Sequence, residues 1–463
     1  MTHDATVMMP TDRTTRPRHA HVSSPDARES WAAWRRGSLP SSRPDVAIVG
    51  LGYVGLPTAL SLVERGYPVW GLDTSVARLG RIQAGTVDLL EEDHRRLSES
   101  LSGGRLRLGN DPGMVAAADV VVICVPTPID EHRLPDLGML RAACASVVEQ
   151  ARQGQLIVLT STTYAGTTRD LLVEPLQARG LRVGEDIFVA FSPERVDPGI
   201  AAHAQHQVPR VVGGVTSQCS ERAARLLGDV ASTIHVVSSP EAAELTKLFE
   251  NTFRAVNISL ANEFATACAE LGADVGEILD AAATKPYGFM KFTPGPGVGG
   301  HCIPCDPHYL LWQLRKHRVR MPTVESAMAS IDARPLEVVE RIRELLADQG
   351  VAPTRARVLV VGATYKPDVE DVRESPALEI MTRLMSLGID VSLADVMVKK
   401  VALDNGITVV SEPLAQLDPA GYDVVLLHTR HAREDVSALS QARVVLDATY
   451  SADPQILPGR VTL

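Results

Sequence analysis

The chain has 463 residues, of which 45% are hydrophobic and 22% are charged, a composition that excludes a fibrous or mainly disordered protein. With 46 Lys and Arg against 56 Asp and Glu, the net charge of -10 excludes a generally basic surface that would recruit nucleic acid or anionic lipid. Six cysteines are too few for a disulfide scaffold, so we expect a cytoplasmic protein with reduced thiols. No apolar stretch reaches the ~18 residues of a membrane span, so we expect no membrane insertion.

The first predicted domain follows a tail. Residues 1–43 are rich in Ser, Thr, Pro and Arg and lack a continuous apolar run, so we expect them to be disordered. Apolar segments then alternate with segments of helical spacing, which predicts a parallel sheet covered on both faces in residues 44–238. The expected strands are 46–50, 69–72, 120–125, 156–160 and 187–191.

Long helices are predicted next. From Glu241 to about Ala283 apolar residues recur every three or four positions, without a glycine until Gly272, so residues 239–340 are expected to form a helical connector domain. A second α/β unit is predicted in residues 341–463, with strands at 357–362, 391–395, 424–427 and 444–447. The expected fold class is therefore α/β, with two Rossmann-like doubly wound domains joined by a helical connector.

A glycine-rich turn follows the first predicted strand. Gly50, Gly52 and Gly55 form the pattern GxGxxG between a strand and a helix, where the glycines permit a tight turn, close approach of a pyrophosphate and close helix packing. Asp73 ends the next strand, where a carboxylate binds the ribose 2′-OH and repels a 2′-phosphate. We therefore predict an NAD site rather than an NADP site.

The segment 294–307 holds two cysteines in a loop built from Gly and Pro. A helix is expected to begin near Pro304, so that its dipole would favour the thiolate of Cys302, and Asp306 could face the same site. One alternative is a buried apolar cysteine. Another is a metal site made by Cys302, Cys305, His301 and His308, although no second Cys-x-x-Cys accompanies them.

Three further polar residues are candidates for catalysis. Lys247 and Asn251 lie one helical turn apart and could stabilise a developing oxyanion, although such spacing also occurs on exposed polar faces. Glu194 directly follows an apolar strand, at the edge where open α/β sheets bind ligands.

Seven motifs occur in an order that resembles the nucleotide-sugar 6-dehydrogenase family, which includes the UDP-glucose and UDP-N-acetylhexosamine dehydrogenases. The resemblance covers about residues 46–450. TKPYGF at 284–289, followed by GGHC, is closer to the N-acetylhexosamine branch, and to UDP-N-acetylglucosamine 6-dehydrogenases in particular. The motifs are GLGYVGLP (50–57), VPTP (125–128), STTYAGTT (161–168), SPER (192–195), ELTKLFENT (244–252), GGHCIPCDP (299–307) and YKPDVEDVRESP (365–376).

The resemblance implies an NAD-dependent oxidation of the 6-hydroxymethyl group of a UDP-sugar to a carboxylate, for surface polysaccharide synthesis. It implies that Cys302 forms a thiohemiacetal and then a thioester, that Glu194 activates water, that Lys247 and Asn251 stabilise an oxyanion, and that Asp306 assists a base. It also implies a homo-oligomer, specifically a homodimer, through the central helical domain. It further implies that the cofactor is contacted by Tyr53, Val54, Arg78, Thr127 and Thr167. It implies that the UDP-sugar is contacted by Arg195, Gly300 and Lys366, and that Thr127 also lies near the reacting carbon.

The chain departs from the family pattern at four positions. Ala165 and Lys291 stand where relatives often carry Pro, Cys305 where an aliphatic residue is usual, and Asp332 where Asn is common. These departures bear on substrate preference, and UDP-glucose and UDP-N-acetylmannosamine are alternative substrates. Two other functions compete: an NAD-fold binding protein without catalysis, and a two-electron hydroxyacid dehydrogenase, which needs neither a cysteine nucleophile nor a second nucleotide-binding unit.

Overall fold

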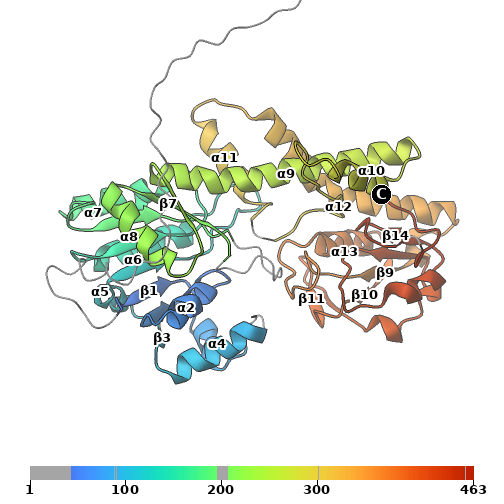
Figure 1. Cartoon of the computed structure of the whole chain (residues 1–463). Helices are drawn as coiled ribbons and strands as arrows, with labels where there is room; N and C mark the ends of the chain where they lie inside the picture. Colours follow the sequence, from blue (N-terminus) through green and yellow to red (C-terminus); the bar gives the residue numbers. More distant parts are fainter. Residues whose placement is uncertain (1–42, 88, 90, 196–206, 301, 454) are drawn as a thin grey trace, which may run out of the picture.

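The chain folds into two α/β units connected by long helices (Figure 1). The structure is a computed structural model that describes residues 43–87, 89, 91–195, 207–300, 302–453 and 455–463. The predicted disordered tail lies outside the described residues except for Arg43. Within the described ranges, no helix combines the length and the apolar character needed to cross a membrane.

An eight-stranded sheet forms the N-terminal unit, in the order β3-β2-β1-β4-β5-β6-β7-β8. Neighbouring strands are parallel except β6 and β7, which run antiparallel. β4 and β5 consist only of buried aliphatic residues, as a parallel sheet covered on both faces requires. The strands are β1 (Val46–Val49), β2 (Val69–Leu72), β3 (Leu106–Gly109), β4 (Val120–Ile123), β5 (Leu156–Leu159), β6 (Phe188–Phe191), β7 (Arg210–Gly214) and β8 (Ile234–Val237).

Helices cover both faces of this sheet. Apolar residues of α2, α3, α4 and α8 pack on one face, and residues of α5, α6, α7 and the start of the central helices pack on the other. The bounds are α2 (Gly55–Glu64), α3 (Val76–Gln83), α4 (Glu91–Ser102), α5 (Gly113–Ala117), α6 (Gly138–Gln150), α7 (Glu174–Ala178) and α8 (Ser217–Gly228). The chain thus forms a doubly wound unit, as predicted.

The central region consists of four helices, α9 (Pro240–Glu270), α10 (Val275–Ala283), α11 (Asp306–Arg315) and α12 (Pro322–Asp348). The side chain of Ser239 caps α9 by accepting from the N–H of Ala242, and Pro240 occupies the first turn. The helical segment expected over 241–283 forms two helices, because Gly272 adopts a φ of +68° just after α9 ends.

The central helices connect the two units physically. The first turns of α9 bury Ala243 and Leu248 against the N-terminal sheet, and its middle packs Ala255 against α12. The last half of α12 then enters the core of the C-terminal unit through residues such as Val338 and Ile342. α9 and α12 therefore hold both units in one assembly (Figure 1).

A four-stranded parallel sheet forms the C-terminal unit, in the order β10-β9-β13-β14. α13 (Pro376–Ser386) and α12 pack on one face of it. A two-stranded hairpin, β11 (Lys400–Ala402) and β12 (Thr408–Val410), lies beside it. The four strands are β9 (Arg357–Val361), β10 (Asp390–Ala394), β13 (Val424–Leu427) and β14 (Val445–Asp447), close to the predicted ranges.

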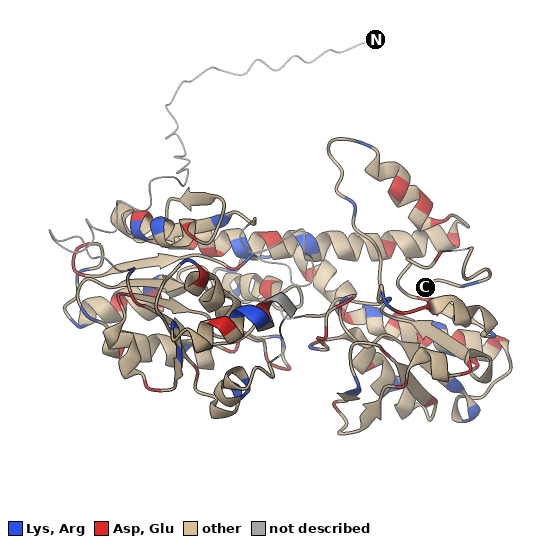
Figure 2. Cartoon of the chain, turned by 60° about the horizontal axis from the view of Figure 1, so that its bottom comes forward, with Lys and Arg blue, Asp and Glu red and all other residues tan. Residues whose placement is uncertain are grey.

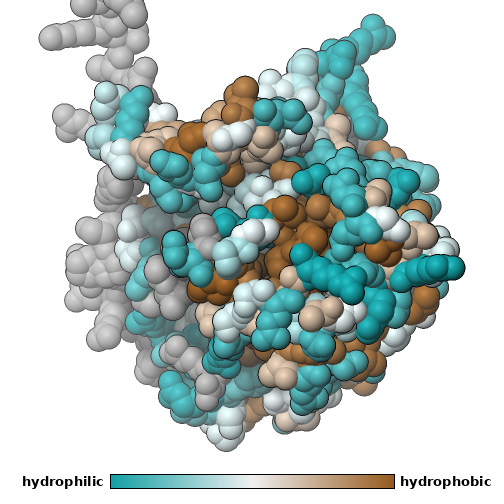
Figure 3. All heavy atoms as spheres, turned by 90° about the vertical axis from the view of Figure 1, so that its right-hand side faces the viewer, coloured by the Kyte–Doolittle hydropathy of each residue, from teal (hydrophilic) through white to brown (hydrophobic). Residues whose placement is uncertain are grey.

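The surface mixes charges of both signs. Figure 2 shows basic and acidic residues interspersed along the elements of both units, in keeping with the modest net charge of -10. The end of the molecule seen in Figure 3 is largely hydrophilic, with a hydrophobic area near its centre.

Candidate active site

The turn between β1 and α2 has the geometry of a dinucleotide cradle. Gly50 has a φ of +91°, and a Cβ there would lie 2.7 Å from the carbonyl oxygen of Cys124. A Cβ on Gly55 would lie 1.8 Å from the carbonyl oxygen of Gly50, so α2 approaches the turn as closely as the third glycine permits. A Cβ on Gly52 would meet no protein atom within 4 Å. The open space at Gly52, in front of the N-terminus of α2, suits a pyrophosphate.

The predicted cofactor residues around this turn hold it in place. Asp73 accepts hydrogen bonds from the N–H of Leu51 (3.0 Å) and of Ser75 (2.8 Å), and Arg78 donates from Nε to the carbonyl oxygen of Leu51 (3.0 Å). Val54 occupies the N-cap position of α2, without a capping hydrogen bond from its side chain, and the ring of Tyr53 is 44% exposed. The half-buried Asp73 carboxylate ends β2 beside the turn, where the ribose of a dinucleotide lies in this fold.

The two predicted threonines lie in loops that follow neighbouring strands. Thr127 is buried after β4, and its carbonyl oxygen accepts from the hydroxyl of Tyr309 on α11 (3.1 Å). Thr167 is buried after β5 and shares a hydrogen bond of 2.7 Å with Thr163. Both loops therefore begin at the carboxyl edge of the sheet, on the side where the glycine turn lies.

Glu244 anchors the loop that carries Thr167. Its buried carboxylate accepts from the N–H groups of Gly166 (2.6 Å) and Thr168 (2.9 Å) and from the hydroxyl of Thr168 (2.6 Å). Burial raises the pKa of Glu244, against the effect of these hydrogen bonds. Sequence reasoning did not single out this residue. Its position one turn before Lys247, on the same face of α9, is the pattern by which it could have been found.

Cys302 lies in a loop that touches the C-terminal unit. The N–H of Gly300 donates to the carbonyl oxygen of Arg373 (3.0 Å), and Gly300 has a φ of +78°. A Cβ on Gly299 would lie 2.6 Å from the carbonyl oxygen of Glu374 and from Cβ of Tyr365. The two glycines are therefore needed for the close contact between the cysteine loop and the segment 365–376.

The side chains of Asn251, Asp306 and Lys247 gather beside Cys302. Asn251 Nδ2 donates to Asp306 Oδ2, joining α9 to the first turn of α11, and Asn251, Asp306 and Lys247 are all buried. The N–H of Asp306 donates to the carbonyl oxygen of Cys302 (2.8 Å). The helix begins at Asp306 rather than near Pro304.

The protonation states at this site depend on burial. Burial raises the pKa of Asp306 to about 6, against opposing effects of Lys247 and Asn251. Burial also raises the pKa of the exposed but closely surrounded Cys302 thiol, although the charge of Lys247 opposes this. Burial of the thiol therefore opposes the thiolate that the helix dipole is expected to favour.

Glu194 and Arg195 reach α9 from the end of β6. Glu194 Oε2 lies 2.8 Å from Arg210 Nη2, and its Oε1 accepts from the N–H of Arg195 (2.9 Å). The Arg195 guanidinium donates to both carboxylate oxygens of Glu250, at 2.5 and 3.1 Å. Since Glu250 adjoins Asn251, these contacts place the end of β6 beside the helix turn that carries Lys247 and Asn251.

Lys366 lies in the segment of the C-terminal unit that faces the cysteine loop. It is half-buried, and its carbonyl oxygen accepts from the hydroxyl of Thr364 (2.9 Å). Seven residues further on, the Arg373 guanidinium lies 3.9 Å from the centre of the Tyr53 ring. The segment 365–376 therefore contacts both the glycine turn and the cysteine loop.

The metal alternative gains no support from the described residues. Burial raises the pKa of the Cys305 thiol to about 12. Burial lowers the pKa of His308 to about 4, and His301 lies outside the described residues. In the part of the chain that the structure describes, no three His, Cys, Asp or Glu side chains are grouped as a metal site requires.

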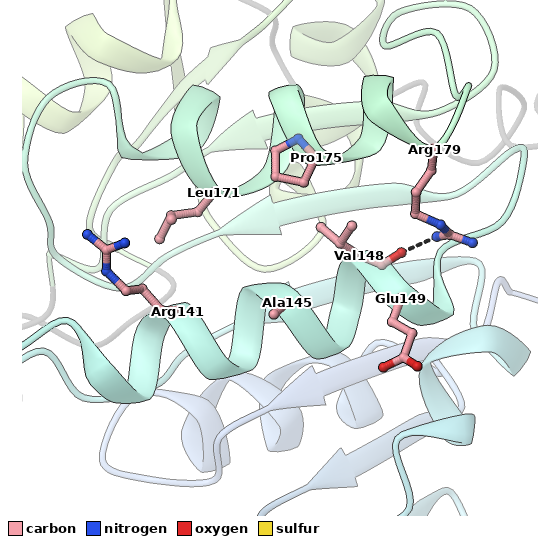
Figure 4. Close-up of a pocket in the computed structure, with 7 residues that line it drawn as sticks. All are labelled: Arg141, Ala145, Val148, Glu149, Leu171, Pro175 and Arg179. Atoms are coloured by element: carbon pink, nitrogen blue, oxygen red, sulfur yellow. Dashed lines mark hydrogen bonds between the residues drawn. The ribbon is translucent and has the colours of Figure 1, made fainter.

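A separate shallow groove lies on the outside of the N-terminal unit (Figure 4). Leu171, in the π-helical turn Arg169–Val173, and Pro175 of α7 face Ala145 and Val148 of α6 across it. Arg179 donates to the carbonyl oxygens of Val148 and Ala151 at one end. None of the candidate catalytic residues lines this groove.

Comparison with known proteins agrees with this geometry. Three family descriptions match in order along the chain. They are the NAD binding domain (residues 44–231), the central domain (241–332) and the UDP binding domain (359–454) of the UDP-glucose/GDP-mannose dehydrogenase family. The chain belongs to this family. It is therefore an NAD-dependent oxidoreductase of the nucleotide-sugar dehydrogenases, and the glycine turn at Gly50 is part of its NAD-binding domain.

Several relatives cover almost the whole chain. A UDP-N-acetyl-D-glucosamine 6-dehydrogenase of Pseudomonas aeruginosa is 33% identical over 88% of this chain and 97% of its own length. A UDP-N-acetyl-D-mannosamine dehydrogenase of Methanocaldococcus jannaschii is 33% identical over 87% of this chain and 91% of its own. A solved structure of a UDP-D-ManNAc dehydrogenase from Pyrococcus horikoshii superimposes with a TM-score of 0.81 at 31% identity, covering 90% of this chain and 98% of that one.

The departures from the family pattern have local partners. Gln313 of α11 binds the backbone of Ala165 twice, accepting from its N–H (3.0 Å) and donating to its carbonyl oxygen (2.6 Å). A proline at position 165 would have no N–H to make the first bond. Asp332 accepts from Arg133 Nη2 (2.9 Å), and Lys291 pairs with Asp280. Each charge added near the site is thus matched by an opposite charge of this chain.

Proposed function

We propose that the protein oxidises the 6-hydroxymethyl group of a UDP-N-acetylhexosamine, UDP-N-acetylglucosamine in the first place, to the corresponding uronic acid. The observation that carries the proposal is the grouping of Cys302 with Lys247, Asn251 and Asp306 beside the contact between the cysteine loop and the UDP-binding domain. The TKPYGF segment and the relative from Pseudomonas aeruginosa support N-acetylglucosamine as the sugar.

The reaction needs two oxidations and one hydrolysis. Bound NAD supplies a hydride acceptor for each oxidation. The residues proposed to hold the NAD are Gly50, Gly52, Tyr53, Val54, Gly55, Asp73, Arg78, Thr127 and Thr167. The UDP-sugar is proposed to contact Glu194, Arg195, Lys247, Asn251, Gly300 and Lys366.

Cys302 is the proposed nucleophile. Its sulfur adds to the C6 aldehyde to give a thiohemiacetal, whose oxidation leaves a thioester. Since burial keeps the pKa of Cys302 raised, a base must take the thiol proton. Asp306, with a pKa of about 6, is ionised at neutral pH and lies beside it. Lys247 and Asn251 donate toward the oxygen on C6 as negative charge develops there.

Water then attacks the thioester carbonyl carbon. Glu194 takes a proton from this water, the carbon–sulfur bond breaks, and Cys302 leaves as the thiolate. The product is a carboxylate, and two NADH form for each sugar. This stoichiometry separates the proposal from a two-electron hydroxyacid dehydrogenase, which forms one.

Two experiments test the proposal. Initial rates with UDP-N-acetylglucosamine, UDP-N-acetylmannosamine and UDP-glucose, with NADH counted per sugar consumed, identify the substrate and the number of oxidations. Cys302→Ser should fold but lose net turnover, because an alkoxide is a poorer leaving group than a thiolate, while the matched Cys305→Ser stays active. Equal behaviour of the two variants, or one NADH per sugar, contradicts the proposal.

We also propose that the protein is a homodimer through the central helices. Six apolar side chains on α9 and just after it are 40–82% exposed. At 100° per residue they lie within an arc of about 100°, which is one stripe along the helix. Replacing Phe249 and Leu260 by Glu should give monomers in light scattering. The six residues are Leu245, Phe249, Phe253, Leu260, Phe264 and Leu271.

A further inference from the structure

Among the described strands of the N-terminal sheet, the one antiparallel pair places an arginine opposite Glu194. β6 and β7 pair with Ala190 opposite Gly214 and Phe191 opposite Gly213. Continuing this register by three residues past the end of β6 sets Glu194 opposite Arg210, the first residue of β7. The side chains meet there, with Arg210 Nη2 2.8 Å from Glu194 Oε2.

This ion pair is well shielded from water. The side chains of Arg210 and Glu194 are 3% and 14% exposed, and the backbone N–H of Arg210 donates to the carbonyl oxygen of Thr233 (2.9 Å) in the sheet. The neighbouring Arg195 is occupied elsewhere, since its guanidinium binds Glu250 and the carbonyl oxygen of Pro209. The two arginines therefore have separate partners, and Arg210 provides the counter-charge for Glu194.

We propose that Arg210 is a positioning residue for hydrolysis of the thioester. This rests on the proposed role of Glu194 as the acceptor of the water proton. Arg210 fixes the Oε2 side of the carboxylate while the N–H of Arg195 holds Oε1, which limits rotation of the base.

The test separates hydride transfer from hydrolysis in the full chain. In Arg210→Met the first NADH should form at close to the wild-type rate, because Arg210 faces Glu194 and not Cys302. Steady turnover should fall roughly 10-fold to 100-fold, and intact-protein mass spectrometry of quenched samples should show the sugar attached to Cys302. Arg210→Lys keeps the positive charge on a shorter side chain and should restore a substantial part of the turnover.

Arg222→Met is the matched control. The Arg222 guanidinium packs on the ring of Phe188, 3.4 Å from its centre, at the opposite end of β6. Arg222 lies on α8, so its removal takes away a comparable side chain that packs on the same strand, and it should leave both the first NADH and the hydrolysis unchanged. If Arg222→Met also accumulates the covalent sugar, the effect belongs to the strand and not to the pair.

The outcomes distinguish this inference from the proposed function. If Glu194→Gln turns over without a covalent sugar, the proposed role of Glu194 fails, whatever Arg210 does. If Glu194→Gln accumulates the covalent sugar but Arg210→Met does not, only the role of Arg210 is overturned. An equal loss of the first NADH and of hydrolysis in Arg210→Met also overturns it. Should Arg210→Met fail to fold, Arg210→Lys must show the same division between the two half-reactions on a smaller scale.

Discussion

The two α/β units use the same turn for different purposes. In each, a glycine with positive φ follows the first strand, +91° at Gly50 and +84° at Gly362. In each, an Asp at the end of the next strand accepts from the N–H after that glycine, Asp73 from Leu51 and Asp395 from Ala363. Each Asp also accepts from the N–H two residues after itself. The backbone of the nucleotide turn is thus present twice.

The side chains around the two turns differ. Thr364, fully buried, stands where the N-terminal turn has Gly52, and Pro367 stands where it has Gly55. α2 begins at Gly55, whereas α13 begins only at Pro376. This turn of the C-terminal unit therefore lacks the glycine and the adjoining helix N-terminus that the N-terminal turn offers to a pyrophosphate, and the longer segment after it reaches the cysteine loop instead.

The acidic residue of the second turn is also closed off. Asp395 is 6% exposed, and Nε2 of the buried His431 lies 3.3 Å from its Oδ2. Asp368 donates its N–H to Nδ1 of the same ring (3.0 Å). A ribose cannot reach this buried carboxylate, so Asp395 serves the fold, whereas Asp73 is the carboxylate proposed to bind the ribose.

The largest effect is expected from Gly55→Ala. Its Cβ would lie 1.8 Å from the carbonyl oxygen of Gly50, so α2 must move away from the turn, and kcat/KM should fall roughly 100-fold or more. Calorimetric titration with NAD and thermal melting measure the loss.

Gly52→Ala sharpens this result, because its Cβ meets no protein atom. It should melt like the wild type but bind NAD at least about 10-fold more weakly. Unchanged NAD affinity in Gly52→Ala would mean that the cofactor does not approach this turn.

Asp395→Ala should lower the free energy of unfolding by about 2–4 kcal/mol. The change removes the acceptor for the N–H groups of Ala363, Met397 and Val398 and for His431. Urea titration measures it, and the preference for NAD over NADP should not change. A variant as stable as the wild type would show that the two carboxylates are not used differently.

Asp73→Ala should lower the ratio of kcat/KM for NAD to that for NADP by about 10-fold, because the carboxylate no longer repels a 2′-phosphate. Asp73→Asn is the matched control, since it keeps the shape and loses the charge. An unchanged ratio in both variants would place Asp73 away from the ribose.

The smallest effect concerns Glu434, near His431. Burial raises the pKa of Glu434 from 4.5 to about 7. The folded state therefore holds a proton that the unfolded state loses between these values, and stability falls as the pH rises through this window. Glu434→Gln should be more stable than the wild type at pH 8 by about 1 kcal/mol or more, and similar at pH 4.5. Equal melting temperatures at pH 8 would contradict this.

The strands that sequence predicts best are the buried ones. β1, β2 and β13 are continuous runs of apolar residues, whose pattern depends only on burial. β3, a half-exposed edge strand, and β7, which begins with the buried Arg210, lack that pattern and were not predicted. Their formation depends on pairing with β2, in the case of β3, and with β6 and β8, in the case of β7, rather than on an apolar pattern of their own.

The candidate site shows the same division. Lys247 and Asn251 share a helix face, so spacing alone places them together. Contacts such as Glu194 with Arg210 and Glu244 with Thr168 join residues that only the folded sheet brings together. The effect of burial on the pKa of Cys302 is not predicted, because the amount of protein around the thiol cannot be read from its neighbours in the chain.

The fit of Gly299 and Gly300 against Tyr365 and Arg373 has a consequence for how the enzyme is made. The cysteine loop finds its packing partner in residues that are synthesised more than sixty positions later. During translation the NAD-binding domain can fold as soon as it emerges, while the cysteine loop still lacks its partner. In the proposed mechanism, chemical competence is therefore acquired only when the last domain docks, and a chain that stops before residue 373 is expected to be a nucleotide-binding fragment whose thiol is not yet in place.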